Sequence, residues 1–351
     1  MIINNSVYRE DITYVADLKL PWEKFANKSI LITGASGLIG SFLIDVLMKK
    51  NSCGLNCTLY AVGRNIEKAK KRFSMYWQSP YFNFISHDIN EPLNLNDVNR
   101  VNYVVHLASN THPVAYATDP IGTVTTNIIG TNNMMKFAIE HKAERFAFAS
   151  SCEVYGENRG DVEFFDELYC GYIDSNTLRA GYPESKRCGE ALCQAYKKKE
   201  NLDVVIIRFA RSYGPTMLNN DTKAISQFIN KAVQGENIVL KSTGTQYYSY
   251  TYVADAVSGF LTVLLNGKSG EAYNIADKKS DVMLKDLAKI IADYVGKEIV
   301  FELPDETEKM GYSKATKARL DGSKLKKLGW NIRYDIKQGV IRTMNILMDL
   351  N

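Results

Sequence analysis

Short apolar runs alternate with amphipathic segments along the first half of the chain. Buried strands are expected at residues 29–33, 58–62, 82–86, 103–107 and 145–149. Helical spacing separates them, most clearly at residues 42–48 and 123–141. Strands that alternate with helices predict an α/β fold with a doubly wound parallel sheet.

The second half of the chain has shorter elements. Helices are expected at 222–233, 255–265, 282–295, 321–328 and 335–348, and strands at 237–241, 271–275 and 299–302. The pattern predicts that residues 29–210 form the main domain and that residues 211–351 form mainly a smaller α/β lobe, interleaved with the sheet. Residues 1–28 are expected to be an arm, with a short amphipathic helix, that packs on the main domain.

Composition limits the function classes. The chain has 351 residues, a net charge of +4 and scattered Lys and Arg, which argues against a nucleic-acid partner. The six Cys lack paired C-x-x-C spacing, so neither a metal site nor a disulfide framework is expected, and reduced thiols fit a cytoplasmic protein. No apolar stretch is long enough to cross a membrane, and no secretory signal is recognisable.

A glycine-rich turn follows the first strand and opens a helix. Gly34 permits the tight turn, Gly37 allows a pyrophosphate to approach the backbone, and Gly40 allows close helix–strand packing. This order predicts a Rossmann site for NAD or NADP, with the pyrophosphate at the helix N-terminus. The residues expected to contact the cofactor here are Gly34, Ser36, Gly37, Leu38, Ile39 and Gly40. A glycine turn without a ligand is the alternative.

The following strands carry further candidate cofactor contacts. The second strand ends in Gly63-Arg64 rather than in a carboxylate, and Arg64 suits a 2′-phosphate, which slightly favours NADP. Stacking of Arg64 on adenine would fit either cofactor. Asp88 and the adjacent Ile89 are expected near the adenine. The residues after the fourth strand that are expected beneath the pyrophosphate and ribose are Leu107, Ala108 and Ser109. His106 is expected to be buried and hydrogen-bonded, not catalytic.

Candidate proton chemistry lies in two segments. Ser150-Ser151-Cys152-Glu153 follows the fifth strand, and Tyr182 and Lys186 are four residues apart on one face of a predicted helix. An ammonium next to a phenol would lower the pKa of the phenol, so Tyr182 could act as a general base. Tyr-x-x-x-Lys alone also occurs on many solvated helices, and its weight here comes from the nucleotide-binding half that precedes it.

Several motifs together resemble the NAD-dependent epimerase/dehydratase family of extended short-chain dehydrogenases/reductases, whose members modify nucleotide sugars. They are TGASGLIG (33–40), HDI (87–89), HLAS (106–109), NIIGTNN (127–133), SSCEVYG (150–156), YPESK (182–186), RFARSYGP (208–215) and YTYVADAV (250–257). The resemblance implies that Tyr182 takes the proton of the sugar's C4 hydroxyl during transient oxidation with tightly bound NAD(P). Lys186 would hold the nicotinamide ribose, and Ser151 would bond to the same hydroxyl.

The resemblance also ranks the reactions. Glu153 is similar to a Glu of the 4,6-dehydratases and UDP-glucuronate decarboxylases. The dehydratases have an acidic Asp before it, whereas this chain has Cys152, and an unperturbed thiol has a pKa of about 8.5. Arg179, shortly before Tyr182, is more like the decarboxylases. UDP-glucuronate decarboxylation is therefore preferred over 4,6-dehydration or epimerisation. A NADP-dependent 4-keto-sugar reductase and a non-catalytic NAD(P)-binding protein are further alternatives.

Two positions depart from the family pattern. Arg211 stands where the family usually has Asn, and Tyr248 stands where it usually has Arg. We hypothesise that Arg211 supplies, from the opposite wall, the cation that position 248 lacks near the sugar diphosphate. A structural ion pair of Arg211 is the alternative. The candidate substrate-binding residues are Cys152, Arg179, Arg211 and Tyr248, and the aperiodic stretch 303–320 is expected to be a loop that closes over the nucleotide.

The resemblance further implies a homodimer. Residues 123–141 and 181–199 resemble the two helices of each chain that form a four-helix interface in this family. Ala191, Leu192 and Ala195 lie on one side of the second helix and suit close packing.

Overall fold

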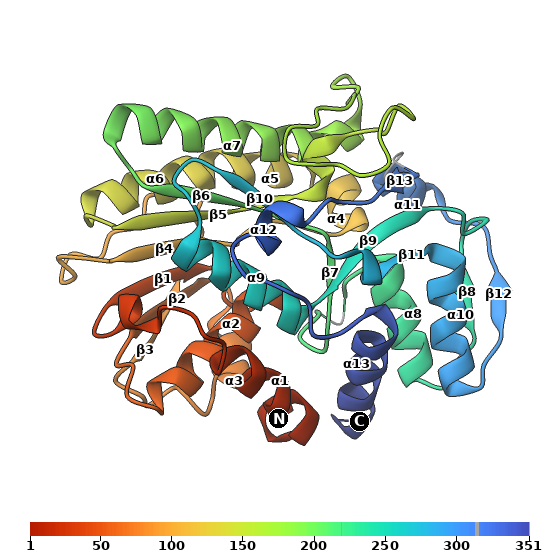
Figure 1. Cartoon of the computed structure of the whole chain (residues 1–351), viewed down its shortest axis with the longest axis horizontal. Coiled ribbons are helices and arrows are strands. Elements are labelled where there is room, and N and C mark those ends of the chain that lie inside the picture. Colours follow the sequence, from red (N-terminus) through yellow and green to blue (C-terminus); the bar gives the residue numbers. More distant parts are fainter. Residues whose placement is uncertain (219, 313–315, 351) are drawn as a thin grey trace.

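The computed structural model describes residues 1–218, 220–312 and 316–350. Its centre is a parallel sheet with the strand order β10-β6-β5-β4-β1-β2-β3 (Figure 1). These strands are β1 (Ser29–Thr33), β2 (Thr58–Gly63), β3 (Phe82–Ser86), β4 (Tyr103–His106), β5 (Arg145–Ser151), β6 (Val204–Phe209) and β10 (Ala272–Ile275). The predicted doubly wound parallel sheet is confirmed. β10 comes from the second half of the chain and pairs with β6, so the two halves share this sheet.

Helices cover both faces of the sheet, which is why its strands are mostly apolar. One face carries α5 (Pro120–Thr125), α6 (Thr131–Glu140) and α7 (Gly181–Glu200), and the other carries α2 (Leu38–Asn51), α3 (Ile66–Arg72) and α9 (Val253–Asn266) (Figure 1). Within β1, Ile30 and Ile32 join one hydrophobic cluster and Leu31 joins the other. The helix expected at 123–141 is divided by a π-helical turn, Thr126–Gly130.

A second, smaller set of elements lies beside the sheet, on the right in Figure 1. Strand β9 (Tyr247–Tyr252) pairs with β7 (Arg211–Tyr213), β11 (Asp281–Met283) and β13 (Lys317–Ala318), and β8 (Ile238–Leu240) pairs with β12 (Ile299–Phe301). The helices here are α8 (Ala224–Val233), α10 (Leu284–Val295) and α13 (Ile336–Leu350), whereas α12 (Ser323–Lys326) packs against β10 and α9.

The stretch 303–320 contains a helix that the sequence analysis missed. Helix α11 (Glu306–Gly311) begins with a capping box, in which Asp305 accepts from the Glu308 amide and the Glu308 side chain accepts from the Asp305 amide. D-x-x-E is a recognisable helix start, but so short a helix has no apolar periodicity. Residues 313–315, part of the predicted closing loop, lie outside the described residues.

The first residues form η1 (Ile2–Asn4), α1 (Ser6–Ala16) and η2 (Trp22–Phe25). Helix α1 packs against α2 and α9, and Tyr8 and Asp11 on its buried face make polar contacts. Tyr8 donates to Asp45 at 2.5 Å, and Tyr252 donates to Asp11 at 2.6 Å. Across the described part of the chain, no helix combines the length and the apolar character needed to cross a membrane.

Candidate active site

A cavity of about 580 Å³ lies where the carboxyl ends of the sheet strands meet the second set of elements. Loops after β1, β2, β3, β4 and β5 line one side, which is where parallel α/β sheets bind ligands. The structure brings every residue predicted for the site into this one pocket: Gly34, Ser36, Gly37, Leu38, Ile39, Gly40, Arg64, Asp88, Ile89, Leu107, Ala108, Ser109, Ser151, Cys152, Glu153, Arg179, Tyr182, Lys186, Arg211 and Tyr248.

The glycine turn is shaped to accept a dinucleotide. Gly34 has φ +67°, and a Cβ there would lie 2.9 Å from the Ala108 amide nitrogen. A Cβ on Gly40 would lie 2.4 Å from the Gly34 carbonyl oxygen, so close packing of α2 on β1 requires glycine. No side chain caps α2, so amide groups of its first turn can bind phosphate. These residues fit the pyrophosphate of a nicotinamide cofactor.

The other end of this groove suits the adenosine part. Arg64 follows β2, with Lys68 on the first turns of α3, and Asp88 follows β3. The Asp88 carboxylate accepts from the Asn90 amide at 3.0 Å, which fixes its direction. Arg64 itself is exposed.

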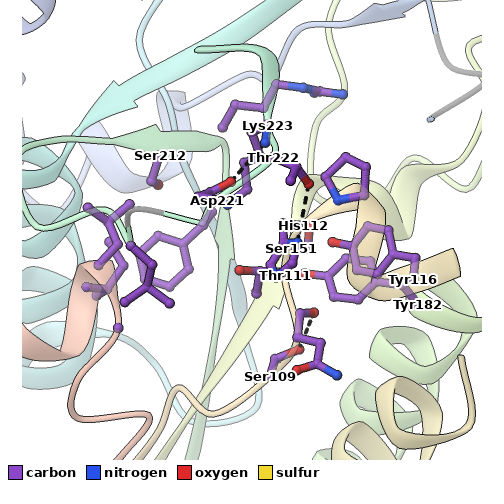
Figure 2. A pocket seen from close by; sticks show the side chains of 18 of the residues that line it. Ser109, Thr111, His112, Tyr116, Ser151, Tyr182, Ser212, Asp221, Thr222 and Lys223 are labelled. Atoms are coloured by element: carbon purple, nitrogen blue, oxygen red, sulfur yellow. Dashed lines mark hydrogen bonds and ion pairs between the residues drawn. The ribbon is translucent and has the colours of Figure 1, made fainter. Parts of the chain in front are cut away.

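The two residues with proton chemistry lie in the first two turns of α7. The Lys186 ammonium is buried, donates to the Ala149 carbonyl at 2.9 Å and lies 6.0 Å from the centre of the Tyr182 ring. Ser151 ends β5, and its hydroxyl accepts from the Glu153 amide at 3.2 Å. The segment after β5 therefore turns back toward α7 and brings Ser151 to the Tyr182 side of the pocket (Figure 2).

The prediction that the pKa of Tyr182 is lowered is wrong for the protein without bound ligands. Burial raises the pKa of the Tyr182 phenol, the Glu153 carboxylate raises it further, and a hydrogen bond with Ser151 partly opposes both. Burial also lowers the pKa of the Lys186 ammonium to about 7. The physical reason is desolvation, which disfavours the charged form of both groups.

Tyr116, on α4 (Pro113–Thr118), was missed by the sequence analysis. Its ring stacks on that of Tyr182 with centroids 4.7 Å apart (Figure 2), and the Arg179 guanidinium lies 4.8 Å from its centroid. Arg179 also forms an ion pair with Glu153. One ion pair and two ring contacts therefore connect Glu153, through Arg179 and Tyr116, to the Tyr182 ring. No sequence signal pointed to Tyr116, because α4 is short and the contact is between distant segments.

Arg211 and Tyr248 lie on the neighbouring strands β7 and β9, not on opposite walls as hypothesised. The Arg211 guanidinium stacks on the Tyr248 ring, 3.4 Å from its centroid, and donates to the Cys152 sulfur at 3.8 Å. The pair therefore adjoins the segment with Ser151 and Glu153. Within the described residues no carboxylate lies at ion-pair distance from Arg211, which contradicts the structural ion pair that was the alternative.

Other pocket residues were also not anticipated. The His112 imidazole and the Thr222 hydroxyl are 3.3 Å apart, and Thr222 also accepts from the Val114 amide (Figure 2). Lys223 pairs with Asp221 at 2.8 Å. The two contacts of Thr222 join the loop after β4 to the segment before α8. The sequence contained no signal for them because they bridge the two halves of the chain.

Asn127 shows why the π-helical turn is present. Its side chain accepts from Ser109 at 2.7 Å and donates to Ser185 at 2.9 Å, so the turn connects the pocket floor to α7. Such turns often occur at functional sites. His106 is confirmed as a buried, hydrogen-bonded histidine: its ring nitrogens contact Thr33 at 2.9 Å and Thr131 at 3.1 Å, and burial lowers its pKa to about 3.

The chain belongs to the NAD dependent epimerase/dehydratase family, which matches residues 30–276. UDP-glucuronic acid decarboxylase 1 of Xenopus tropicalis is 34% identical over 93% of this chain and 75% of its own length. UDP-glucuronic acid decarboxylase 6 of Arabidopsis thaliana is 30% identical over 90% of this chain and 87% of its own. The family is NAD dependent, which confirms the nicotinamide cofactor expected from the sequence and does not support the slight preference for NADP.

Solved structures share the fold at lower identity. UDP-glucuronic acid 4-epimerase from Bacillus cereus has a TM-score of 0.78 and 22% identity, over 92% of this chain and 100% of its own. The dTDP-glucose 4,6-dehydratase DesIV from Streptomyces venezuelae has a TM-score of 0.77 and 22% identity, over 92% of this chain and 97% of its own. The resemblance to an epimerase/dehydratase fold is thus confirmed.

Proposed function

We propose that the protein is a nucleotide-sugar enzyme that decarboxylates UDP-glucuronate after transient oxidation at C4. The observation that carries the proposal is that Ser151, Tyr182 and Lys186 lie in one pocket with the Glu153–Arg179 ion pair. Two relatives that match at least 90% of the chain are UDP-glucuronic acid decarboxylases. The fold alone also fits epimerases and dehydratases, so the residues decide the ranking.

Bound NAD supplies hydride acceptance and return at C4, together with the positive charge of its oxidised ring. The glycine turn and α2 would hold its pyrophosphate, and Lys186 would hold the ribose. Tyr182 Oη takes the proton of the C4 hydroxyl, to which Ser151 Oγ also bonds. Since burial raises the pKa of Tyr182, proton removal depends on the charge that the ligands add.

The 4-keto sugar is a β-keto acid, which explains why oxidation precedes loss of carbon dioxide. The C5–C6 bond breaks, carbon dioxide leaves, and the electron pair forms the C4–C5 enolate. A proton then adds to C5 in place of the lost carboxylate. Glu153 is held by Arg179 next to this site, so its carboxylate is oriented for the sugar rather than free to rotate.

A mass-spectrometric assay of the purified protein with UDP-, dTDP-, GDP- and CDP-sugars tests the proposal. Loss of carbon dioxide from UDP-glucuronate is expected. Loss of water from a neutral hexose would instead establish a 4,6-dehydratase. An unchanged mass with an altered NMR spectrum would establish an epimerase, and net turnover of NAD(P)H would establish a reductase.

We extend the proposal to assembly and compartment. Ala191 and Ala195 are exposed on α7, and Ile121 and Ile129 are exposed on the neighbouring segment, 77% and 45% respectively. An exposed apolar and small-residue surface on these two helices supports a homodimer. The six cysteines are free, which supports a reducing compartment such as the cytoplasm.

A further inference from the structure

Near Tyr182, the described part of the protein does not supply a carboxylate partner for every positively charged side chain that lines the pocket. Arg179 is paired with Glu153, Lys223 with Asp221 and Lys241 with Glu308. Arg211 has no carboxylate at ion-pair distance among the residues described, although it is half-buried. The cluster of Arg179, Arg211 and Glu153 thus contains two guanidinium groups and one carboxylate.

The neighbours of Arg211 do not neutralise it. Tyr248 offers the face of its ring, and Cys152 offers a thiol, whose pKa burial raises, so it stays uncharged. Ring stacking fixes the guanidinium plane and leaves its edges free for hydrogen bonds. Removing a guanidinium from water without a counter-ion is costly, so an anion that arrives with the substrate would be bound strongly.

The position of Arg211 identifies which substrate anion this is. Its contact with Cys152 places the guanidinium beside Ser151 and Glu153, the segment that faces the reacting carbon. The glycine turn with α2, which holds the cofactor phosphates, is a different part of the pocket wall. A carboxylate on the sugar ring, next to the oxidised carbon, matches this position and suits the planar fork of an Arg.

We infer that Arg211, held by stacking on Tyr248, binds the carboxylate of a nucleoside-diphosphate hexuronate and selects it against the neutral hexose. This inference rests on the proposed function, since it names the group that the same site recognises. It makes Arg211 a specificity-determining residue for the sugar carboxylate, and not the replacement for a diphosphate-binding Arg that the sequence analysis hypothesised.

The test measures binding of UDP-glucuronate, UDP-glucose and UDP to the NAD-bound protein by calorimetry. A Tyr182→Phe background prevents turnover during the titration. Arg211→Met should lower the affinity for UDP-glucuronate by about 10- to 100-fold, the range for a lost charged hydrogen bond. The affinities for UDP-glucose and UDP should change by less than about 3-fold. Arg211→Lys should retain part of the preference, since it keeps the charge but not the planar fork.

The matched control is Arg319→Met. Arg319 also stacks on a tyrosine of β9, Tyr247 at 4.4 Å, but it does not line the pocket, so all three affinities should stay unchanged. Equal weakening of all three ligands by Arg211→Met would assign Arg211 to the diphosphate and overturn the inference. If Arg211→Met does not fold, equal affinity of the unsubstituted site for UDP-glucuronate and UDP-glucose would overturn it too.

The binding test and the decarboxylation test can succeed or fail independently of each other. Selective loss of UDP-glucuronate binding, without carbon dioxide release by the unsubstituted enzyme, would support the carboxylate site and reject decarboxylation. Carbon dioxide release, with no selective effect of Arg211→Met on binding, would support decarboxylation and reject the carboxylate site.

Discussion

Whether Tyr182 can lose its proton is decided by groups that surround its ring. Burial and the Glu153 carboxylate both raise the pKa of the phenol, whereas Ser151 and Arg179 lower it. Stacking on Tyr116 fixes the ring orientation but adds no charge. In the protein without ligands, the balance of these effects favours the protonated phenol.

Tyr182→Phe should lower kcat by about 10²- to 10⁴-fold, the usual contribution of a general acid–base group. The substitution removes one oxygen and leaves the ring to stack on Tyr116, so NAD affinity should change little. Steady-state kinetics and NAD titration measure both. Tyr81→Phe, outside the pocket, is the control. Retention of kcat within a few-fold in the Tyr182 variant would exclude Tyr182 as the proton acceptor.

Lys186 makes a pH-dependent contribution to stability in the cofactor-free protein. Its pKa is lowered by burial from 10.5 to about 7, so between these values the unfolded chain binds more protons than the folded chain. The free energy of unfolding, relative to Lys186→Met, should therefore rise as pH increases from about 7 toward 10.5 and be flat below that window. Urea unfolding of both proteins at several pH values measures it. A difference that is constant or falls with pH would contradict a lowered pKa.

At the scale of elements, α4 and α11 close one side of the pocket. The two helices pack together, and α4 carries Tyr116. Lys241, which lines the pocket, donates to Glu308 of α11 at 2.5 Å. Glu308 also completes the capping box, so its side chain both stabilises the start of α11 and connects this helix to Lys241 of the pocket.

Glu308→Ala should raise KM for the nucleotide sugar about 3- to 10-fold, since it removes a helix cap and a partly buried ion pair worth about 1 kcal/mol. NAD affinity should stay unchanged, because α11 does not contact the glycine turn. Glu306→Ala is the matched control, since Glu306 pairs with exposed Lys309 on the same helix and does not line the pocket. Equal KM values for the two variants would show that α11 does not help to bind substrate.

At the scale of the whole molecule, the pocket lies between two halves that the chain connects repeatedly. β10 returns from the second half to the main sheet, and the contact between His112 and Thr222, which both line the pocket, also joins the halves. The helices proposed to form the dimer lie on one outer face of the sheet, formed by α5, α6 and α7 (Figure 1).

The protein should elute in light-scattering chromatography with twice its chain mass of 39.5 kDa. Ala195→Lys on exposed α7 should shift it toward the monomer, because a buried unpaired charge in a helix–helix contact is costly. Lys297→Ala, on the second set of elements, is a control that should not change the mass. A monomer without any substitution would reject the proposed dimer.

The sequence by itself determined the alternation of strands and helices, the glycine turn and the Tyr182/Lys186 spacing. Each of these is a local pattern, because side-chain periodicity, turn geometry and i,i+4 neighbours are set within a few residues of chain. Every residue predicted for the site does line the pocket, since strand ends in a parallel sheet meet at one edge. Their individual roles stay predictions.

Only the tertiary structure decided the contacts between distant segments. The stacking of Tyr116 on Tyr182 joins residues 66 positions apart, from 116 to 182, and no local pattern encodes it. The pairing of β7 with β9 placed Arg211 against Tyr248 rather than across from it, because strand neighbours depend on the packing of the whole lobe. Burial, which also arises only on folding, set the pKa directions of Tyr182 and Lys186.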